Sequence, residues 1–353
     1  MKAIVKARPG PGMVVQEMPE PSLGPRDVLI RVRAGSVCGT DAHIFQWDAW
    51  AQGRIKPPLI IGHEFAGEVA EVGSAVTGFR KGDPVSAEGH LVCGTCALCR
   101  TGQGHICPNT RIIGVDVHGA WAECIAMPAT NVWKLEAAMP WEVATLHDAM
   151  GNAFHTVMPA EVAGKTVLIQ GCGPIGCFAA GVAKAAGAAR ILAADINPKR
   201  LALAERMGAQ VLLNAKTEDV VAKARELTGG LGVDVVCEMS GAPAAIRQAV
   251  QAVRNGGRVR LLGIPPGEVP LRLAEDVIFK GITLEGVIGR RMYETWHQMR
   301  EFLGSGKFDP TPVITHRLPY QEFEAGLAAI ADGTAGKVVL LFDAKAAQGR
   351  SPA

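Results

Sequence analysis

The chain lacks the features that mark several special classes of protein. It contains no run of about 18 consecutive apolar residues, so no membrane-spanning helix is expected. Its first residues, Met1–Lys6, look like a strand and not like the apolar core of a secretory signal, so no signal peptide is expected. The formal net charge is only +2 and no basic stretch stands out. Nucleic acid is therefore not an expected partner, and a zinc ribbon that binds it is not the expected fold.

What is present is an ordinary globular composition with a distinctive group of cysteines. Hydrophobic residues make up 48% of the 353, enough for more than one buried core, so two domains are expected. Four of the nine cysteines lie between positions 93 and 107, and the other five are scattered. An odd total with one tight cluster is typical of a metal site in a reducing compartment rather than of disulfides. We therefore expect a cytoplasmic protein that binds metal.

The order of strands and helices predicts two kinds of domain. Residues 1–150 contain short strand-like runs between Gly/Pro turns, for example Val28–Arg33, and indicate a β-rich domain. Beyond Gly164, strands alternate with helices, which predicts an α/β fold with a doubly wound parallel sheet of the Rossmann type. The strands expected there are Thr166–Gln170, Arg190–Ala194, Val211–Leu213, Asp234–Cys237, Arg258–Leu262 and Thr283–Val287, and the helices include Pro174–Ala186, Pro198–Met207 and, after the sheet, Trp296–Leu303.

The change from a β-rich pattern to alternating strands and helices predicts the domain boundaries. We expect the sheet domain to span 151–295 and the β-rich domain to combine 1–150 with a return segment, 296–343. The tail 344–353 is small and polar, so we expect it to be disordered.

A glycine-rich turn predicts a dinucleotide site at the first strand of the sheet domain. Gly171, Gly173 and Gly176 form the pattern G-x-G-x-x-G between an expected strand and an expected helix. The first glycine allows the tight turn, the second lets the backbone approach a pyrophosphate, and the third lets helix and strand pack closely. The free N–H groups at the helix N-terminus then face the phosphates.

Asp195, at the end of the next expected strand, indicates which dinucleotide binds. A carboxylate there can accept hydrogen bonds from both ribose hydroxyls and repels a 2′-phosphate, so NAD is expected rather than NADP. Lys199 and Arg200 lie nearby in the chain and could soften that preference. The alternative without function is a glycine-rich turn followed by a capping aspartate.

The cysteine cluster predicts a structural zinc site. Cys93, Cys96, Cys99 and Cys107 offer four thiolates in one loop, and closed tetrahedral sites with four thiolates are structural zinc sites. An iron–sulfur cluster is the alternative, because the pattern C-x2-C-x2-C followed later by Cys-Pro also occurs in ferredoxins. The last gap is seven residues here, longer than the gap of about three in the bacterial ferredoxin run, which favours zinc.

A second set of metal-binding side chains is less clear when its members are taken singly. Cys38 could be an ordinary buried thiol, His63 a core histidine and Glu64 an exposed carboxylate. Their surroundings change this interpretation, because Gly62-His63-Glu64-x2-Gly67-x5-Gly73-x2-Val76 is followed by Gly82-Asp83-x-Val85.

Over nearly its whole length the chain resembles the zinc-containing medium-chain dehydrogenase/reductase family. The early cysteine, the His-Glu block, the four-cysteine lobe and the Rossmann unit occur in the family's order. The resemblance implies a β-rich GroES-like catalytic domain with a structural zinc lobe. It also implies one catalytic and one structural zinc per subunit, the catalytic ion being held by Cys38, His63 and Glu64. Asp148 would be a further ligand, or a hydrogen-bonding partner of the substrate or of a water on the zinc.

A longer set of motifs resembles the branch of this family that oxidises L-threonine. The resemblance implies oxidation of its 3-hydroxyl to 2-amino-3-oxobutanoate with NAD+ as hydride acceptor, a step of threonine degradation. The alternative is an NAD-dependent dehydrogenase of a polyol such as sorbitol or 2,3-butanediol, and a relative without catalysis is a third hypothesis. The motifs are Cys38–Ile44, Trp47–Trp50, Glu88–His90, Gly151–Thr156, Glu238–Pro243, Leu262–Pro266, Glu294–Trp296 and Ile314–Arg317.

Within that family the resemblance also implies roles for residues around the reacting carbon. Thr40 and His43 would form a hydroxyl–imidazole relay that carries a proton out of a dry site. Buried charges of L-threonine need partners. Asp148 and Glu64 are candidate anions for its ammonium, and His90 is a candidate donor. Arg290 is a candidate bidentate clamp for its carboxylate, as is its neighbour Arg291.

The same resemblance implies further contacts with the cofactor and between subunits. A homotetramer is implied, with sheet domains pairing through the apolar edge near Thr283–Val287. Ile175 would pack under the pyrophosphate turn and Arg200 would flank the adenosine. The positions expected to line the nicotinamide end, at strand termini, are Leu262, Gly263, Ile264, Ile288 and Gly289.

Overall fold

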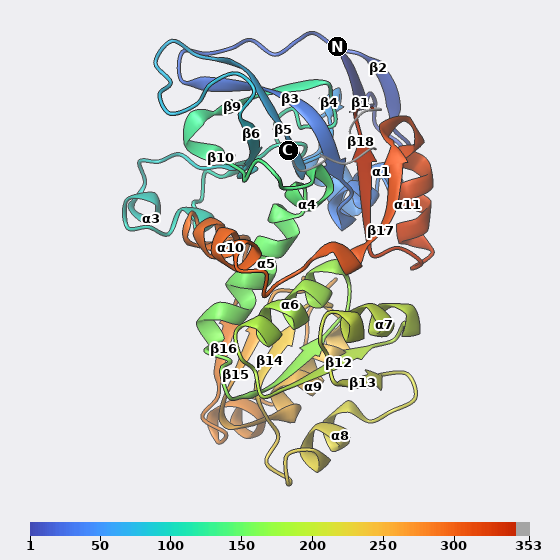
Figure 1. Ribbon diagram of the computed structural model, residues 1–353. Helices are drawn as coiled ribbons and strands as arrows, with labels where there is room; N and C mark the ends of the chain where they lie inside the picture. The colour runs from blue at the N-terminus through green and yellow to red at the C-terminus, as the bar shows by residue number, and fades with distance from the viewer. Residues whose placement is uncertain (344–353) are drawn as a thin grey trace. The chain divides into compact units, whose positions relative to one another are not determined.

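The computed structural model describes residues 1–343, which form two compact units (Figure 1). Within the described residues, unit 1 contains Met1–Asp148 and 314–343, and unit 2 is Ala149–Val313. The expected disorder of 344–353 lies outside the described residues. Among the described residues, no helix has the length and apolarity needed to cross a bilayer.

Unit 2 is built on one six-stranded parallel sheet. Its strand order is β13-β12-β11-β14-β15-β16, so the chain starts at β11, moves outward in one direction and then returns to continue in the other. This is the doubly wound order, and its reversal between β11 and β14 is where such folds bind ligands. The strands are β11 (Thr166–Gln170), β12 (Arg190–Asp195), β13 (Val211–Asn214), β14 (Val233–Glu238), β15 (Val253–Leu261) and β16 (Thr283–Gly286).

The helices of unit 2 follow the strands, as a parallel sheet requires. The helix α6 begins with Pro174 in its first turn, where the missing N–H costs nothing, and buries an Ala-rich face against β11 and β12. The helices are α6 (Pro174–Ala185), α7 (Pro198–Arg206), α8 (Val220–Glu226), α9 (Pro243–Ala252) and α10 (Glu294–Gly304), with a π-helical turn, η4 (Leu273–Ile278).

Two details of unit 2 differ from the sequence analysis. The strand β15 begins at Val253, before the predicted start at Arg258, and its pairing with β14 shifts register between these two residues. Unit 2 also extends to Val313, beyond the end at residue 295 that was predicted for the sheet domain. The physical reason is a group of aromatic side chains, because Phe302 and Phe308 lie edge to face with Phe154 at centroid distances of 5.0 and 5.8 Å.

Unit 1 contains mixed and antiparallel sheets. The largest has seven strands in the order β10-β6-β5-β3-β18-β17, with β9 beside β3, and only β17 and β18 run parallel. Smaller sheets have the orders β2-β1-β4 and β7-β8. The strands are β1 (Lys2–Lys6), β2 (Val14–Glu17), β3 (Asp27–Ser36), β4 (Leu59–Ile60), β5 (Phe65–Val72), β6 (Pro84–Ala87), β7 (His90–Leu91), β8 (Arg111–Ile112), β9 (Cys124–Pro128), β10 (Val132–Lys134), β17 (Ile314–Pro319) and β18 (Lys337–Leu341).

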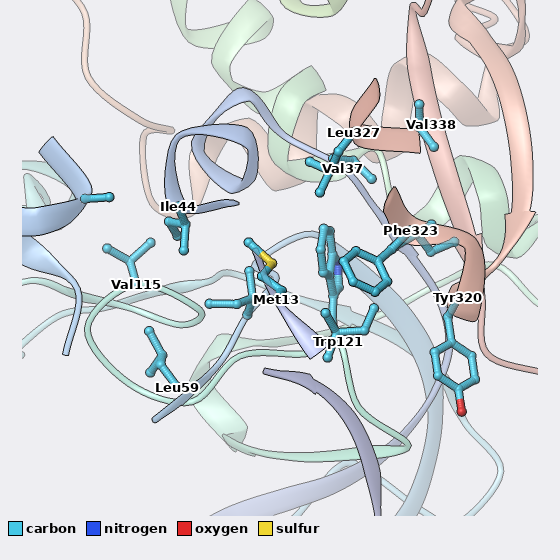
Figure 2. Close-up of a cluster of buried hydrophobic side chains, with 14 of the residues drawn as sticks. Met13, Val37, Ile44, Leu59, Val115, Trp121, Tyr320, Phe323, Leu327 and Val338 are labelled. Atoms are coloured by element: carbon cyan, nitrogen blue, oxygen red, sulfur yellow. The ribbon is translucent and has the colours of Figure 1, made fainter. Parts of the chain in front are cut away.

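A buried hydrophobic cluster ties the early part of unit 1 to its late part (Figure 2). Trp121, Phe323 and Val338 belong to this cluster although they lie far apart in the sequence. Gly62 faces the same tryptophan so closely that a Cβ there would lie 2.1 Å from its ring, and its φ of +90° also favours glycine. The helices of this part are α1 (Gly39–Gln46), α2 (Ala49–Arg54), α3 (Ala97–Arg100), α4 (Trp141–Ala144), α5 (His147–Val157), which runs on into unit 2, and α11 (Phe323–Ala331).

Candidate functional site

Three predicted metal ligands meet in unit 1. Cys38 is the residue before helix α1, and His63 and Glu64 directly precede strand β5. One ligand atom from each of the three lies within 4.8 Å of those of the other two. The tight turn at Gly62 and the start of α1 therefore bring a thiol, an imidazole and a carboxylate together.

Unsatisfied polar atoms at this cluster fit a bound cation. His63 Nδ1 and Glu64 Oε1 are buried without a hydrogen-bond partner, and such atoms are rare in folded proteins unless something else binds them. Asp41 is fully buried, accepts the Cys38 N–H at 2.8 Å and places its other oxygen 3.8 Å from His63 Nδ1. Burial raises the pKa of Asp41 to about 6, against the opposing effect of His63. The donor set of Cys, His and Glu suits zinc.

Lys337 completes this cluster and was not anticipated. Its Nζ donates to Glu64 Oε2 and, at 3.1 Å, to the carbonyl of Val37, while the Ser36 hydroxyl donates to the same carboxylate oxygen. Burial is the largest single effect and lowers the pKa of Lys337, but the charges of Glu64, Cys38 and Asp148 together outweigh it and the net shift of the pKa is upward. One oxygen of Glu64 is thus neutralised by a lysine, and the other is left for a ligand.

The predicted relay residues lie on helix α1. Thr40 Oγ1 is 3.8 Å from Cys38 Sγ, so this hydroxyl is next to the cluster. His43 lies one turn further, and its side chain is 58% exposed. Its Nδ1 is 2.6 Å from Asp48 Oδ2, and its ring meets the Trp50 ring edge to face.

The structure does not bring Asp148 and His90 into the group of three ligands. Asp148 is the second residue of helix α5 and is half-buried. Burial lowers the pKa of His63, but the charges of Asp41, Cys38 and Asp148 together raise it. His90 lies on β7, where its Nδ1 is 2.8 Å from the buried carboxylate of Glu88. Both remain candidates for contact with the substrate.

The four-cysteine lobe has the dimensions of a tetrahedral zinc site. Sγ–Sγ distances of 4.0 Å for Cys93–Cys99, 3.8 Å for Cys96–Cys107 and 3.6 Å for Cys107–Cys93 match the roughly 3.8 Å edge implied by Zn–S bonds of about 2.3 Å. The Cys96 and Cys99 amides point at the thiols of Cys93 and Cys96, which suits thiolates.

The thiols of this lobe also influence one another's ionisation. Backbone N–H groups of Thr95 and Cys96 lower the pKa of Cys93 to about 5. Burial and the neighbouring thiols raise the pKa of Cys99 to about 12. Several thiolates at these distances repel one another, so a cation is needed to hold them together.

The glycine turn of unit 2 has the close contacts that its pattern predicted. Gly171 has φ +87°, and a Cβ there would lie 2.7 Å from Ser240. A Cβ on Gly176 would lie 1.9 Å from the Gly171 carbonyl. A Cβ on Gly173, the residue before α6, would meet nothing within 4 Å, so this position faces open space. The turn thus leaves helix N–H groups accessible to an anion.

Asp195 holds the turn and borders the same open space. Its Oδ2 accepts the N–H of Cys172 at 2.6 Å and its Oδ1 accepts the N–H of Asn197 at 2.8 Å. Each carboxylate oxygen has a second lone pair for a further donor. The sequence suggested a ribose-binding carboxylate, and the structure adds that the same carboxylate also fixes the glycine turn.

A cavity of about 400 Å³ lies beside this turn, entirely within unit 2. Arg200 borders it, and its Nε is buried without a hydrogen-bond partner. Met239 and Ser240 border it at the reversal of strand order, where a dinucleotide is expected. Of the predicted cofactor residues, the cavity includes Gly171, Gly173, Asp195 and Arg200 but not Ile175, Gly176, Leu262, Gly263, Ile264, Ile288 or Gly289.

The predicted nicotinamide-side residues lie in the loops after β15 and β16, where Leu262, Gly263 and Gly289 are half-buried. Ile264 is 90% exposed and Ile288 is 61% exposed. Gly263 must be glycine, because a Cβ there would lie 2.0 Å from the Gly241 amide and 2.7 Å from Glu238 Oε2. Glu238 was quoted only as part of a motif. It is fully buried and accepts hydrogen bonds from the Ser240 and Gly241 amides, so it fixes the turn that follows β14.

Arg290 is almost completely buried, with 1% of its surface exposed. Its side chain packs over Gly151 of helix α5, where a Cβ would lie 2.4 Å from Arg290 Cδ. His155, one turn further along α5, binds the Gly289 carbonyl through Nδ1 at 3.0 Å. By contrast, Arg291 is half-exposed and lies 3.5 Å from Glu294. The two arginines that the sequence could not distinguish therefore have different surroundings.

Two protein-family models match the chain, one in each unit. The alcohol dehydrogenase GroES-like domain matches residues 24–137, and the zinc-binding dehydrogenase model matches residues 174–305. The first match covers Cys38, His63, Glu64 and the four-cysteine lobe, and the second begins at Pro174, the first residue of helix α6, and runs through the later strands of the sheet.

Several known proteins are similar over nearly the whole chain. An L-threonine 3-dehydrogenase of Bacillus velezensis is 51% identical, covering 97% of this chain and 99% of its own. That of Symbiobacterium thermophilum is 49% identical, covering 98% and 99%. Among solved structures, an alcohol dehydrogenase of Thermus sp. ATN1 has TM-score 0.88 and 31% identity, covering 97% and 99%. A zinc-binding dehydrogenase of Sinorhizobium meliloti bound to NADP has TM-score 0.89 and 27% identity, covering 96% and 98%.

These matches confirm the family, the fold class and the cofactor type expected from the sequence. The chain belongs to the family of zinc-binding alcohol dehydrogenases, which makes it an oxidoreductase that uses zinc and a nicotinamide dinucleotide on a small-molecule substrate.

Proposed function

We propose that this protein oxidises the 3-hydroxyl of L-threonine to 2-amino-3-oxobutanoate, with NAD+ accepting the hydride, as a step of threonine degradation. The observation that carries the proposal is the 49–51% identity, over almost the whole chain, to enzymes named for this reaction. The cluster of Cys38, His63 and Glu64 supports it, because an alcohol must be activated before it can lose hydride.

The proposed roles in unit 1 follow from the donor sets. Cys38, His63 and Glu64 would hold a zinc ion that, as a Lewis acid, lowers the pKa of an alcohol hydroxyl. The four cysteines of the lobe would hold a second, structural zinc. Thr40 Oγ1 takes the hydroxyl proton and His43 passes it to solvent, a route supported by the position of Thr40 beside Cys38 and the exposure of His43.

L-Threonine brings two further charges that need partners. Asp148 is the proposed anion for its ammonium, because Glu64, the other candidate, has one oxygen bound to Lys337 and Ser36 and the other assigned to zinc. His90 is the proposed donor to the hydroxyl or the carboxylate of the substrate. We assign the carboxylate to Arg290, with Arg291 as the alternative. The burial of Arg290 supports this choice, since a desolvated guanidinium binds a carboxylate more strongly than an exposed one.

The proposed roles in unit 2 concern the dinucleotide. Asp195 would bind the adenosine ribose and disfavour NADP, with Arg200 at its side in the same cavity. Gly171, Gly173, Ile175 and Gly176 would receive the pyrophosphate. The residues that follow the strand ends and are proposed to line the nicotinamide are Leu262, Gly263, Ile264, Ile288 and Gly289.

A substrate panel with a metal count tests this proposal. Purified protein should contain two zinc ions per chain and should reduce NAD+ faster with L-threonine than with sorbitol or 2,3-butanediol. Faster reduction with a polyol would contradict the substrate and favour the polyol dehydrogenase hypothesis. Cys38→Ser should remove one zinc and abolish turnover, whereas unchanged activity would contradict the ligand role of Cys38.

We also propose a homotetramer located in the cytoplasm, in which unit 1 is the catalytic domain and unit 2 the NAD-binding domain. Strand β16 is an edge strand, and Leu284 on it is exposed together with Ile278 and Phe279 just before it. An apolar edge of this kind is suited to pairing with the same edge of a second copy. Leu284→Lys should reduce the mass measured in solution, and an unchanged mass would contradict pairing at this edge.

A further inference from the structure

We propose that Asp48 is a positioning residue of the proton route: it fixes the tautomer and orientation of the His43 imidazole. This inference rests on the proposed function, because it concerns the route assigned to Thr40 and His43. It adds a residue to that route, and it assigns a purpose to the Trp47–Trp50 motif.

The local backbone places Asp48 against His43. Helix α1 ends at Trp47, whose left-handed conformation (φ 60°) turns the chain, and the Trp47 N–H donates to the His43 carbonyl at 2.9 Å. Asp48 follows the turn, so its Oδ2 reaches His43 Nδ1 at 2.6 Å. Trp50, two residues later, meets the ring of His43 edge to face at a centroid distance of 6.1 Å. The imidazole is therefore held by a carboxylate and an indole from the same short segment.

The two oxygens of Asp48 have separate tasks. Oδ1 accepts the Ala51 N–H at 3.0 Å and caps the N-terminus of α2, whereas Oδ2 is committed to His43. The Ala51 amide and then His43 lower the pKa of Asp48, which keeps it ionised and able only to accept hydrogen bonds. A cap needs only one acceptor, so the contact with His43 is more than the helix requires.

An ionised carboxylate at Nδ1 determines which ring nitrogen of His43 can accept a proton. Nδ1–H donates to Asp48, so neutral His43 has its free lone pair on Nε2, which can accept a proton. The His43 side chain is 58% exposed and that of Asp48 is 36% exposed, so the ring can release the proton to water. Without Asp48 the ring would sample both tautomers and several orientations, and proton transfer would slow.

Two substitutions separate this role from helix capping. Asp48→Asn and Asp48→Ser both keep a side-chain oxygen that can cap α2, because Asn and Ser are as good as Asp at that position. Neither offers a carboxylate to Nδ1. We expect each to lower kcat about tenfold or more. The KM for NAD+ should stay within about twofold and the melting temperature within about 2 °C, since the cap remains.

External base and a double variant make the test specific. Added imidazole should restore part of the lost kcat in Asp48→Asn and in His43→Ala but change the wild type little, because a soluble base can replace a missing relay. In a His43→Ala background, Asp48→Asn should cost nothing further. Full activity of Asp48→Asn, a loss that imidazole does not restore, or an additive loss in the double variant would each overturn the proposal.

A spectroscopic measurement keeps this inference independent of the substrate. Nitrogen NMR of labelled histidine should find His43 protonated on Nδ1 in the wild type and mixed between tautomers in Asp48→Ser. A wild type that does not oxidise L-threonine would defeat the proposed function alone. An equal mixture of tautomers in the wild type would defeat the role of Asp48 alone.

Discussion

At the scale of single residues, the contacts of Glu64 determine which of its oxygens can bind a metal ion. It is a buried carboxylate with one oxygen bound to Lys337 and Ser36 and the other without a hydrogen-bond partner. Lys337 and Ser36 both donate to Oε2 of Glu64, so only Oε1 remains to bind zinc.

Lys337→Met should destabilise unit 1, because it leaves the buried Glu64 charge without its partner. Breaking a buried ion pair from one side costs about 3–5 kcal/mol. Thermal unfolding of zinc-depleted protein measures the loss. Lys337→Met combined with Glu64→Gln should recover much of it, since no unpaired charge then remains. A single variant as stable as the wild type would show that Glu64 is not charged there.

Asp195 provides a second residue-scale prediction. Asp195→Asn retains an acceptor for the Cys172 or Asn197 amide but removes the charge that would repel a 2′-phosphate. A hydrogen bond to a charged group is worth about 1.5–3 kcal/mol, so the preference for NADH over NADPH should fall about tenfold or more. Fluorescence titration with both cofactors measures this ratio. An unchanged ratio would contradict the assignment of Asp195 to the ribose.

At the scale of elements, helix α5 supports the 289–290 segment through small and polar positions. Gly151 makes room for the side chain of Arg290, and His155, one turn later, binds the carbonyl of Gly289. Residues four apart lie on the same face of a helix, so one face of α5 contacts two consecutive residues of the segment. The motif Gly151–Thr156 thus has a packing explanation that does not require contact with substrate.

Gly151→Ala should displace Arg290, because the new Cβ would lie 2.4 Å from Cδ and 2.5 Å from Cγ of that side chain. Overpacking of this kind costs about 1–3 kcal/mol. If Arg290 binds the carboxylate, the KM for L-threonine should also rise while the KM for NAD+ changes little. Gly304→Ala in helix α10 is a matched control, because a Cβ there meets nothing within 4 Å. Equal behaviour of the two variants would contradict the packing argument.

At the scale of the whole molecule, the two units divide the chemistry. The ligand cluster and the four-cysteine lobe lie in unit 1, and the glycine turn with its cavity lies in unit 2. Each unit contains buried hydrophobic clusters of its own residues. The dinucleotide site is therefore expected to survive changes to the metal sites.

Removal of zinc with a chelator should abolish turnover but leave the affinity for NADH within about twofold, since the cavity is lined only by residues of unit 2. The lobe should lose its order without metal, because structural zinc sites contribute folding energy directly. Trypsin should then cleave the lobe after Arg100, whereas the zinc-loaded protein should resist cleavage there. A large loss of NADH affinity would contradict the independence of the two sites.

The amino-acid sequence by itself determined the features that depend on neighbouring residues. The strands β11 and β12, the helices α6 and α7, the glycine turn and the four-cysteine lobe were predicted with nearly the observed bounds. Each of these depends on local periodicity or on ligands spaced within one loop, which a sequence displays directly. The start of β15 at Val253 instead of Arg258 was not predicted, because an irregular pairing with β14 joins the two parts of the strand and pairing between strands is not visible in a local pattern.

Only the tertiary structure decided which distant residues meet. Lys337 reaches Glu64 across 273 positions, and no spacing rule connects them. Arg290 and Arg291 are adjacent in the sequence, yet packing against Gly151 buries the first and leaves the second half-exposed. Such pairings come from how strands and helices pack, which depends on the shapes of whole elements rather than on any short pattern. For that reason the zinc ligands could be proposed from motifs, whereas their charge partner could be found only in the folded chain.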